Sequence, residues 1–226
     1  MNWPAVALVL ALTACADVNY QDAEPGAFRG SLFVMWVGEG GALGDGKFLY
    51  VPDPRDPLTF VSAKGGPAIT PGIFYTDGGS IPKAAQMFQG FSPWGYAPAY
   101  VVHDWLFVAH HCNVDGTPSE DQAALKGMTF QRSAELIGEA IRTLVAEGRV
   151  RENDVAPAVI TGTVAGPIAR SLWDRKGACK DHEVLPEDAA RARAALSGSG
   201  ARMMKRSDDG SLVPIPPAVI VGKVDF

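Results

Sequence analysis

Glycine and proline residues divide the first third of the chain into short apolar runs, and this spacing limits the fold more than any other feature. The runs are rich in β-branched and aromatic residues, as strands are, and they cover residues 28–37, 47–51, 58–61 and 69–75. Parallel neighbours need a crossover of about a dozen residues or more, which these turn-rich intervals do not supply. The runs therefore predict an antiparallel β meander.

Helical patterns replace strands in the second half of the chain. Residues 98–111 predict a central helix that is apolar on nearly all sides and is therefore buried. Other helices are predicted at 83–89, 119–131 with a kink at Gly127, 133–147, 152–173 as one kinked helix or two short ones, and 186–196. These patterns together predict an α+β fold, with a small antiparallel β meander followed by a helical cluster.

The length of 226 residues suits one domain of ordinary size. We predict a single α+β domain over residues 28–178 and a partly flexible C-terminal tail over 179–226, in which 212–224 is an extended segment on a sheet edge. The net charge of −5 provides no basic surface. Because nucleic acids are bound through clustered Lys and Arg, no nucleic acid is expected as a partner.

The N-terminus predicts export. Residues 4–14 form an apolar run that is too short to span a membrane but is typical of a signal peptide. Leu12-Thr13-Ala14-Cys15 resembles the lipobox of bacterial lipoproteins, in which the cysteine becomes the lipidated first residue. We therefore predict a signal peptide over 1–15, lipidation of Cys15, a tether over 16–27, and a lipid-anchored protein that faces the periplasm. Because Met1-Asn2-Trp3 has no Lys or Arg, a buried N-terminal segment with a free Cys15 is the alternative.

Lipidation of Cys15 would leave two cysteines, Cys112 and Cys179. In an oxidising periplasm such a pair is expected to form a disulfide, which would stabilise the fold by about 4 kcal/mol. In a cytoplasmic protein both would remain thiols. The chain has no Cys-x-x-Cys sequence, so a cysteine-based metal site is not predicted.

Acidic and imidazole side chains in otherwise apolar segments are the candidates for chemistry. Asp77 lies in a Gly-rich turn, His103 and Asp104 lie in the central helix, and Asp121 begins the next helix. Mixed imidazole and carboxylate ligands suit zinc, manganese or iron, so Asp77, His103 and Asp104 form a candidate metal site, with Asp121 as ligand or general base. The alternative is structural: Asp77 would cap its own turn, and His103 and Asp104 would form a buried hydrogen-bond network.

Two other catalytic arrangements are open. Ser80, a plausible helix N-cap, would be the nucleophile of a triad with His103 and an aspartate. The chain has no Gly-x-Ser-x-Gly elbow, which argues against this triad. Cys112 beside His111 would form a dyad, but adjacent residues of a helix point apart. His182, in the predicted tail, has no predicted role.

The stretches Thr76-Asp77-Gly78-Gly79-Ser80-Ile81-Pro82 and Ala99-Tyr100-Val101-Val102-His103-Asp104-Trp105-Leu106-Phe107 occur in this order. Together they resemble the bacterial and phage domain-of-unknown-function family 1353, over roughly residues 45–145. The resemblance implies the β-then-α layout and one site holding Asp77, Ser80, His103, Asp104 and Asp121, but it implies no activity. The chain departs from the family in having Phe107 where tyrosine is usual. The His-Asp doublet is also similar to that of HD phosphohydrolases, but no histidine precedes His103 as their pattern requires.

The sequence therefore leaves two functions open. The first is a metal-dependent hydrolase of the bacterial cell envelope that uses zinc or manganese, with peptidoglycan as the substrate suggested by location and with Asp121 and Ser80 as candidate catalytic residues. The second is a non-catalytic envelope lipoprotein or phage-related binding protein, in which the His-Asp network is structural and the surface binds a partner.

Overall fold

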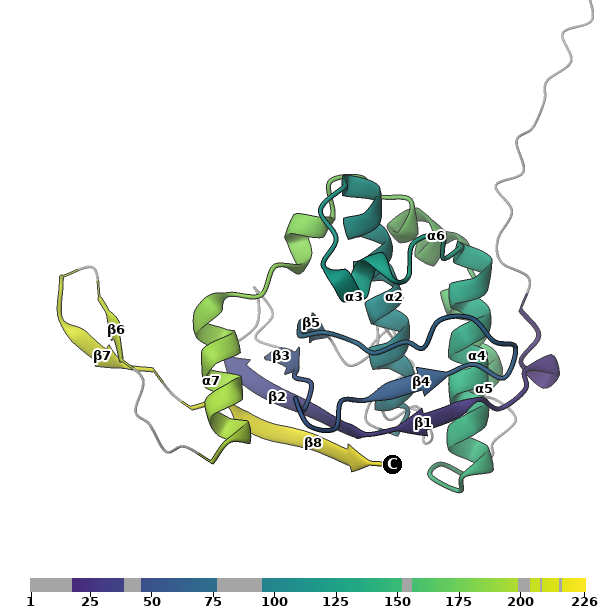
Figure 1. Ribbon diagram of the computed structural model, residues 1–226, viewed down its shortest axis with the longest axis horizontal. Helices are drawn as coiled ribbons and strands as arrows, with labels where there is room; N and C mark the ends of the chain where they lie inside the picture. Colours follow the sequence, from purple (N-terminus) through teal and green to yellow (C-terminus); the bar gives the residue numbers. More distant parts are fainter. Residues whose placement is uncertain are drawn as a thin grey trace, which may run out of the picture.

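The fold is α+β, as the sequence predicts, with helices packed on both faces of a small antiparallel sheet (Figure 1). The computed structural model describes residues 18–38, 46–76, 95–151, 156–198, 204–207, 209–215 and 217–226. The strands are β1 (Ala27–Arg29), β2 (Ser31–Gly38), β3 (Lys47–Tyr50), β4 (Thr59–Val61), β5 (Phe74–Thr76), β6 (Met204–Arg206), β7 (Leu212–Pro214) and β8 (Val219–Asp225). The main sheet has the order β5-β3-β2-β8.

A left-handed glycine changes the predicted meander. Gly30 has φ of 81°, and it separates the predicted strand 28–37 into β1 and β2. The chain passes so close to the 56–57 turn here that a Cβ on Gly30 would lie 2.2 Å from the carbonyl oxygen of Pro57. As a result β1 pairs with β4 in a separate ladder, whereas β2 pairs with β3 and β8. The predicted meander is therefore wrong in one respect: its third strand, 58–61, is β4, which does not pair with β3 or β5 in the main sheet.

Both faces of β2 are buried, which explains its uninterrupted apolar sequence. Leu32 and Val34 face a large core that also contains residues of α2 and α4. Phe33 and Met35 face the opposite side, where they cluster with Ala192 of α7. The sheet is thus a middle layer with helices on each side.

The central helix α2 (Ala97–Asp115) extends the predicted 98–111 at both ends. Pro98 stands in its first turn, and the αL residue Gly116 ends it. The other helices are η1 (Tyr20–Asp22), α3 (Glu120–Ala123), α4 (Phe130–Ala146), α5 (Ala156–Val164), α6 (Pro167–Trp173), η2 (Cys179–His182) and α7 (Pro186–Leu196). Among the described residues no helix is long and apolar enough to cross a membrane.

One predicted helix is shorter than expected, and one predicted helical segment takes the second of its two expected forms, two short helices. The predicted 119–131 helix is only the short α3, because Gly127 adopts φ of 86° and Thr129 then caps a new helix, α4. The predicted 152–173 segment forms two helices, since Gly166 and Pro167 separate α5 from α6. The predicted helix 83–89 lies outside the described residues.

The predicted tail over 179–226 contributes to the packed structure. Helix α7 coincides with the predicted 186–196 helix and lies against β2. Strand β8 adds to the edge of the main sheet beside β2, so the extended edge segment predicted within 212–224 is confirmed. Among the described residues of this segment, the β6–β7 hairpin is the part that projects away from the body (Figure 1).

The predicted tether over 16–27 is packed from residue 18 onward. Tyr20 is buried in η1, and the N–H of Gly26 donates to Thr143 Oγ1 of α4 at 2.8 Å. The described residues, which begin three positions after Cys15, are thus already packed against α4.

Candidate functional site

The candidate centre lies where the end of β5 meets α2. His103 and Asp104 are consecutive on α2, so their side chains point about 100° apart and meet different neighbours. The half-buried Asp104 faces β5, where its Oδ2 accepts a hydrogen bond of 3.1 Å from Thr76 Oγ1. The ring of His103 lies on the neighbouring face, with its centroid 5.0 Å from that of Phe107.

His103 is buried at this junction. Removal from water lowers the pKa of its imidazole to about 4, because burial disfavours the charged form. Its Nε2 atom is buried and has no hydrogen-bond partner in the part of the chain that the structure describes. Buried polar atoms normally have a partner, so this atom calls for an explanation. A neutral imidazole with its proton on Nδ1 presents at Nε2 the lone pair that binds a divalent metal.

Of the other residues predicted for this centre, the structure describes Asp121 but not the rest. Asp77 and Ser80 lie outside the described residues, as does Cys15. Asp121 is exposed at the start of α3, next to Gln122, whose carbonyl accepts a 2.6 Å hydrogen bond from Asn113 near the C-terminal end of α2.

Asn113 is about 15 Å along the helix axis from His103, because an α-helix rises about 1.5 Å per residue. The described arrangement therefore does not bring Asp121 beside His103, for the reason that the short loop after α2 starts α3 at the far end of the helix. Within the described ranges, no group of three or more His, Cys, Asp or Glu side chains could hold a metal ion. Asp77, the third predicted ligand, is not among the residues so described.

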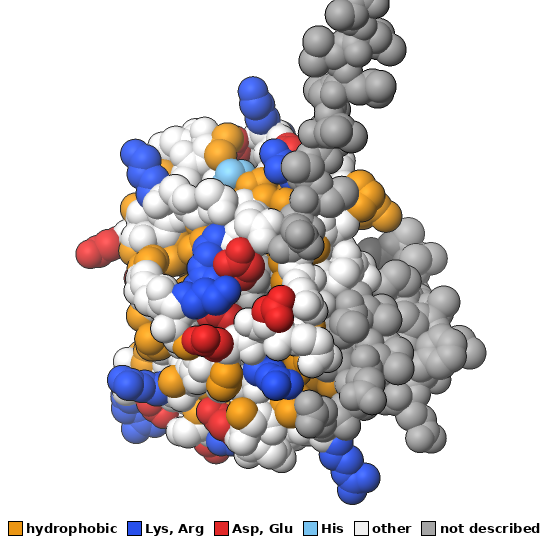
Figure 2. Space-filling view, turned by 90° about the vertical axis from the view of Figure 1, so that its right-hand side faces the viewer, with side chains coloured by type: hydrophobic (Ala, Val, Ile, Leu, Met, Phe, Trp, Pro, Cys, Tyr) orange, Lys and Arg blue, Asp and Glu red, His pale blue; other side chains and the backbone are white. Residues whose placement is uncertain are grey.

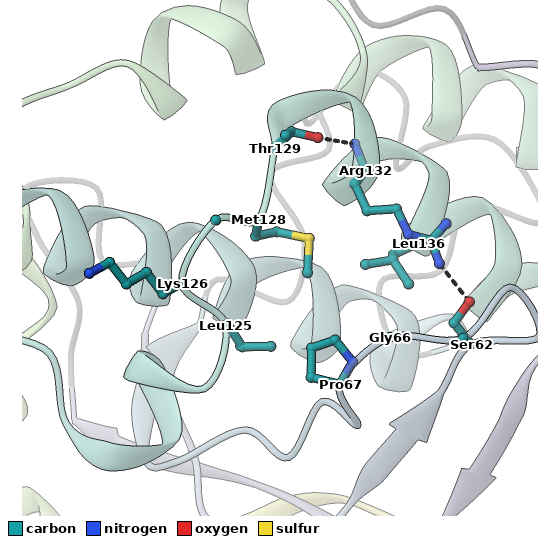
Figure 3. Close-up of a pocket in the computed structure, with 11 residues that line it drawn as sticks. Ser62, Gly66, Pro67, Leu125, Lys126, Met128, Thr129, Arg132 and Leu136 are labelled. Atoms are coloured by element: carbon teal, nitrogen blue, oxygen red, sulfur yellow. Dashed lines mark hydrogen bonds between the residues drawn. The ribbon is translucent and has the colours of Figure 1, made fainter.

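A separate pocket lies between the turn at 65–67 and the segment that joins α3 to α4 (Figure 3). Its volume is about 310 Å³. Apolar side chains and Arg132 line it, and Figure 3 shows Arg132 hydrogen-bonded to Ser62. Of the predicted site residues that the structure describes, neither His103, Asp104 nor Asp121 lines this pocket.

The same region contains a buried ionic network that the sequence analysis missed. The side chain of Glu139 is only 1% exposed and accepts a 2.6 Å hydrogen bond from Arg132 Nη1. Ser62 Oγ donates to Glu139 Oε2, and it accepts from Arg132 Nη2 and from the N–H of Lys64. Because both acceptor positions of the serine oxygen are occupied, Ser62 is a structural junction and not a poised nucleophile. The signal for this network was the spacing of Arg132, Glu135 and Glu139 along one helix face.

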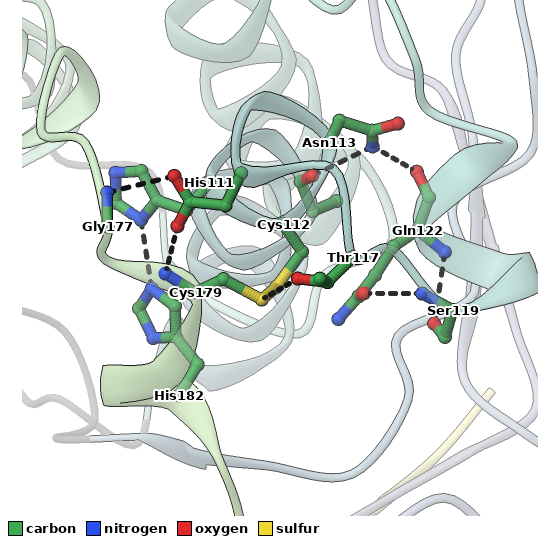
Figure 4. Close-up of a disulfide and its surroundings, with 11 residues drawn as sticks. His111, Cys112, Asn113, Thr117, Ser119, Gln122, Gly177, Cys179 and His182 are labelled. Atoms are coloured by element: carbon green, nitrogen blue, oxygen red, sulfur yellow. Dashed lines mark hydrogen bonds between the residues drawn. A yellow bond between two sulfur atoms is a disulfide. The ribbon is translucent and has the colours of Figure 1, made fainter.

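Cys112 and Cys179 form the predicted disulfide, which joins the C-terminal end of α2 to η2 (Figure 4). Asp115 supports the same junction, since its carboxylate accepts hydrogen bonds from the N–H groups of Gly177 and Cys179 at 2.8 and 2.9 Å. Because the sulfur of Cys112 is bonded, the alternative Cys112–His111 dyad is ruled out in this state.

His182, which had no predicted role, contacts His111 beside the disulfide (Figure 4). His111 Nε2 lies 2.9 Å from the carbonyl oxygen of Leu172, which can only accept, so this nitrogen donates. In the neutral pair His111 Nδ1 therefore accepts from His182 Nε2 at 2.9 Å. Nothing in the sequence spacing indicates this contact, which depends on the disulfide bringing η2 to α2.

Comparisons with known proteins found no match: no family model matches the chain, and neither a curated protein nor a solved structure matches it.

Proposed function

We propose that the chain is a metal-dependent hydrolase of the bacterial cell envelope, with its centre at the junction of β5 and α2. The observation that carries this proposal is the buried Nε2 of His103, which has no hydrogen-bond partner among the described residues. Beside it, Asp104 supplies a carboxylate whose orientation is held by Thr76. A histidine and an oriented carboxylate on adjacent residues are the ligand types that zinc and manganese use.

The residues fit such an ion as follows. His103 would bind through Nε2 and Asp104 through its carboxylate, while the Thr76 hydrogen bond supports that carboxylate in the way common around metal ligands. Asp77 follows Thr76 directly in the sequence and is the proposed third ligand. A bound divalent ion would supply a water of lowered pKa for attack on the substrate.

The substrate and the location come from the sequence. The resemblance to family 1353 groups Asp77, Ser80, His103, Asp104 and Asp121, and the lipobox-like residues before Cys15 support a location in the envelope. Peptidoglycan is the proposed polymer. Ser80 remains a candidate catalytic residue. Asp121, in α3, lies near the C-terminal end of α2, too far from His103 to share an ion with it in the described arrangement.

Elemental analysis tests the proposal directly. The full chain purified without chelator should contain about one zinc or manganese ion, and His103→Ala should lose it. The matched control is His110→Ala, which removes an imidazole from the same helix outside the candidate centre. Equal metal content in the wild type and His103→Ala would refute the proposal, provided that circular dichroism shows both to be folded.

A second function is favoured by one specific observation. Because Thr76 Oγ1 donates to Asp104, that carboxylate already links the sheet to α2 as a structural network would. Under this reading the protein is a non-catalytic envelope lipoprotein, or a phage-related binding protein. A wild-type chain that is free of metal and does not release soluble fragments from peptidoglycan would favour it.

A further inference from the structure

The first described residues are held tightly to the helical layer. Val18 packs against α4 and α5, with its Cγ1 3.9 Å from the position that a Cβ on Gly138 would take. Asn19 caps η1 through a 3.1 Å hydrogen bond from the N–H of Gln21, and Tyr20 is buried. The first described residues thus lie on the side of α4 and α5, which η1 contacts.

Three residues of chain cannot reach far. Fully extended, the segment from Cys15 to Val18 spans at most about 11 Å. If Cys15 carries the lipid, as the proposed function requires, the surface around Val18 must lie close to the lipid headgroups. The body cannot turn this side away from the membrane.

An apolar pair is exposed on the helix that follows α5. The side chains of Ile168 and Leu172 on α6 are 78% and 42% exposed. They are four residues apart, so they lie on one face of the helix. Figure 1 places α6 next to α4 and α5, and Figure 2 shows hydrophobic side chains along the upper part of the face on that side.

The same segment is basic although the chain is acidic. Residues 167–182 contain Arg170, Arg175, Lys176 and Lys180 against Asp174 and Asp181, so that four positive minus two negative charges leave +2. Arg170 pairs with Asp174 and Arg175 pairs with Asp181, both at 2.7 Å, so the excess positive charge is that of the exposed Lys176 and Lys180. The whole chain carries −5. Anionic headgroups attract such local positive charge, and exposed apolar side chains beside it enter the interface.

We propose that α6 and the residues after it, 167–182, form the surface that contacts an anionic phospholipid bilayer. The short tether brings this side to the membrane, Ile168 and Leu172 insert between headgroups, and Lys176 and Lys180 bind lipid phosphates. The disulfide from Cys179 to Cys112 fastens the surface to α2, the helix that carries His103 and Asp104. Membrane contact would therefore set the orientation of the candidate centre relative to the bilayer.

The test uses the full lipidated chain in phosphatidylglycerol-containing vesicles that include a phospholipid with a nitroxide near its headgroup. With Cys15 lipidated and Cys112 and Cys179 joined, Ile168→Cys would carry the only free thiol for a fluorophore. Leu212→Cys is the matched control, because Leu212 is 61% exposed on the projecting β6–β7 hairpin. We expect nitroxide quenching at position 168 to be about threefold stronger than at position 212.

A second arm tests the charges. Lys176→Glu with Lys180→Glu should reduce quenching at position 168 in phosphatidylglycerol vesicles but not in purely zwitterionic ones, while Lys126→Glu on the α3–α4 segment should change neither. Equal quenching at positions 168 and 212 in a chain that mass spectrometry shows to be lipidated would overturn the proposed surface and leave the anchor intact. An unlipidated Cys15 would overturn both, and the metal analysis would still decide the hydrolase proposal separately.

Discussion

The hydroxyl of Thr76 donates a 3.1 Å hydrogen bond to Oδ2 of Asp104, and this bond connects the last residue of β5 to the middle of α2. If Asp104 binds a metal, this bond orients its carboxylate. Thr76→Val keeps the shape of the side chain but removes the donor. We expect the affinity for zinc to fall roughly tenfold, as for other supporting contacts around metal ligands.

Thr76→Ser is the control, since serine restores the hydroxyl and should restore the affinity. Competition with a chromophoric chelator measures both variants. An unchanged affinity in Thr76→Val would show that this hydrogen bond has no role in metal binding.

The buried imidazole of His103 should make the metal-free protein less stable in acid. Its pKa is about 4 in the folded protein but near 6.5 in an unfolded chain, so only the unfolded state takes up the proton between these values. Stability is full above pH 6.5 and is lost as the pH falls toward 4, by about 3 kcal/mol. Urea titrations across this range, with a chelator present, measure the loss.

His103→Gln has no titrating group at this position, so its stability should fall less over the same pH range. The comparison separates His103 from His110 and His182, whose pKa values are also lowered, chiefly by burial. Parallel pH curves for the wild type and this variant would contradict the prediction.

The Cys112–Cys179 disulfide closes a loop across a sequence separation of 67. Replacement of both cysteines by alanine should lower the free energy of unfolding by about 4 kcal/mol, because the unfolded chain gains the entropy of the opened loop. The midpoint of urea denaturation measures this change, and reduction of the wild type should reproduce it. A double variant that unfolds at the same midpoint as the oxidised wild type would show that the disulfide does not form in the protein.

Two glutamates on α4 share Arg132 but differ in burial. Glu139 has a side chain only 1% exposed, so Glu139→Gln removes the buried charge that pairs with the partly exposed Arg132 and should cost about 3 kcal/mol. Glu135 is 29% exposed, and Glu135→Gln should cost less than about 1 kcal/mol. Thermal denaturation of the two variants gives the comparison, and equal losses would mean that burial does not decide the strength of this network.

Gly30 and Gly65 allow strain and crowding to be separated. Both have φ near 80°, but a Cβ on Gly30 would lie 2.2 Å from the Pro57 oxygen, whereas one on Gly65 has nothing within 4 Å. Gly65→Ala should cost about 1 kcal/mol for the left-handed conformation alone. Gly30→Ala should cost about 3 kcal/mol or more because the β1–β2 junction must move away from the turn. Denaturant melts measure both, and similar losses would show that the close approach at Gly30 relaxes easily.

Local sequence patterns predicted most of the secondary structure. The buried helix α2, helix α7 and the break at Gly166-Pro167 follow from apolar periodicity and from residues that end helices, which act within a few positions of the chain. Gly127 shows the limit of such patterns, because its φ of 86° ends a segment that otherwise has a helical sequence.

The sequence likewise predicted only part of the candidate site and its surroundings. The sequence alone identified His103 and Asp104, because an imidazole and a carboxylate in the middle of a buried helix are costly without a purpose. It did not identify Thr76 as the partner of Asp104, Glu139 as the centre of an ionic network, or His182 as the partner of His111. The Thr76–Asp104 and His111–His182 contacts join residues 28 and 71 positions apart, and the Glu139 network reaches Ser62, 77 positions away.

The sequence by itself thus determined the class of fold, most helices, and the cysteine pair, since these depend on periodicity, composition and count. Only the tertiary structure decided that β1 leaves the main sheet to pair with β4, and that the edge strand β8 pairs with β2. The physical reason is that strand partners and side-chain contacts depend on how distant segments share one core. No local propensity encodes that choice.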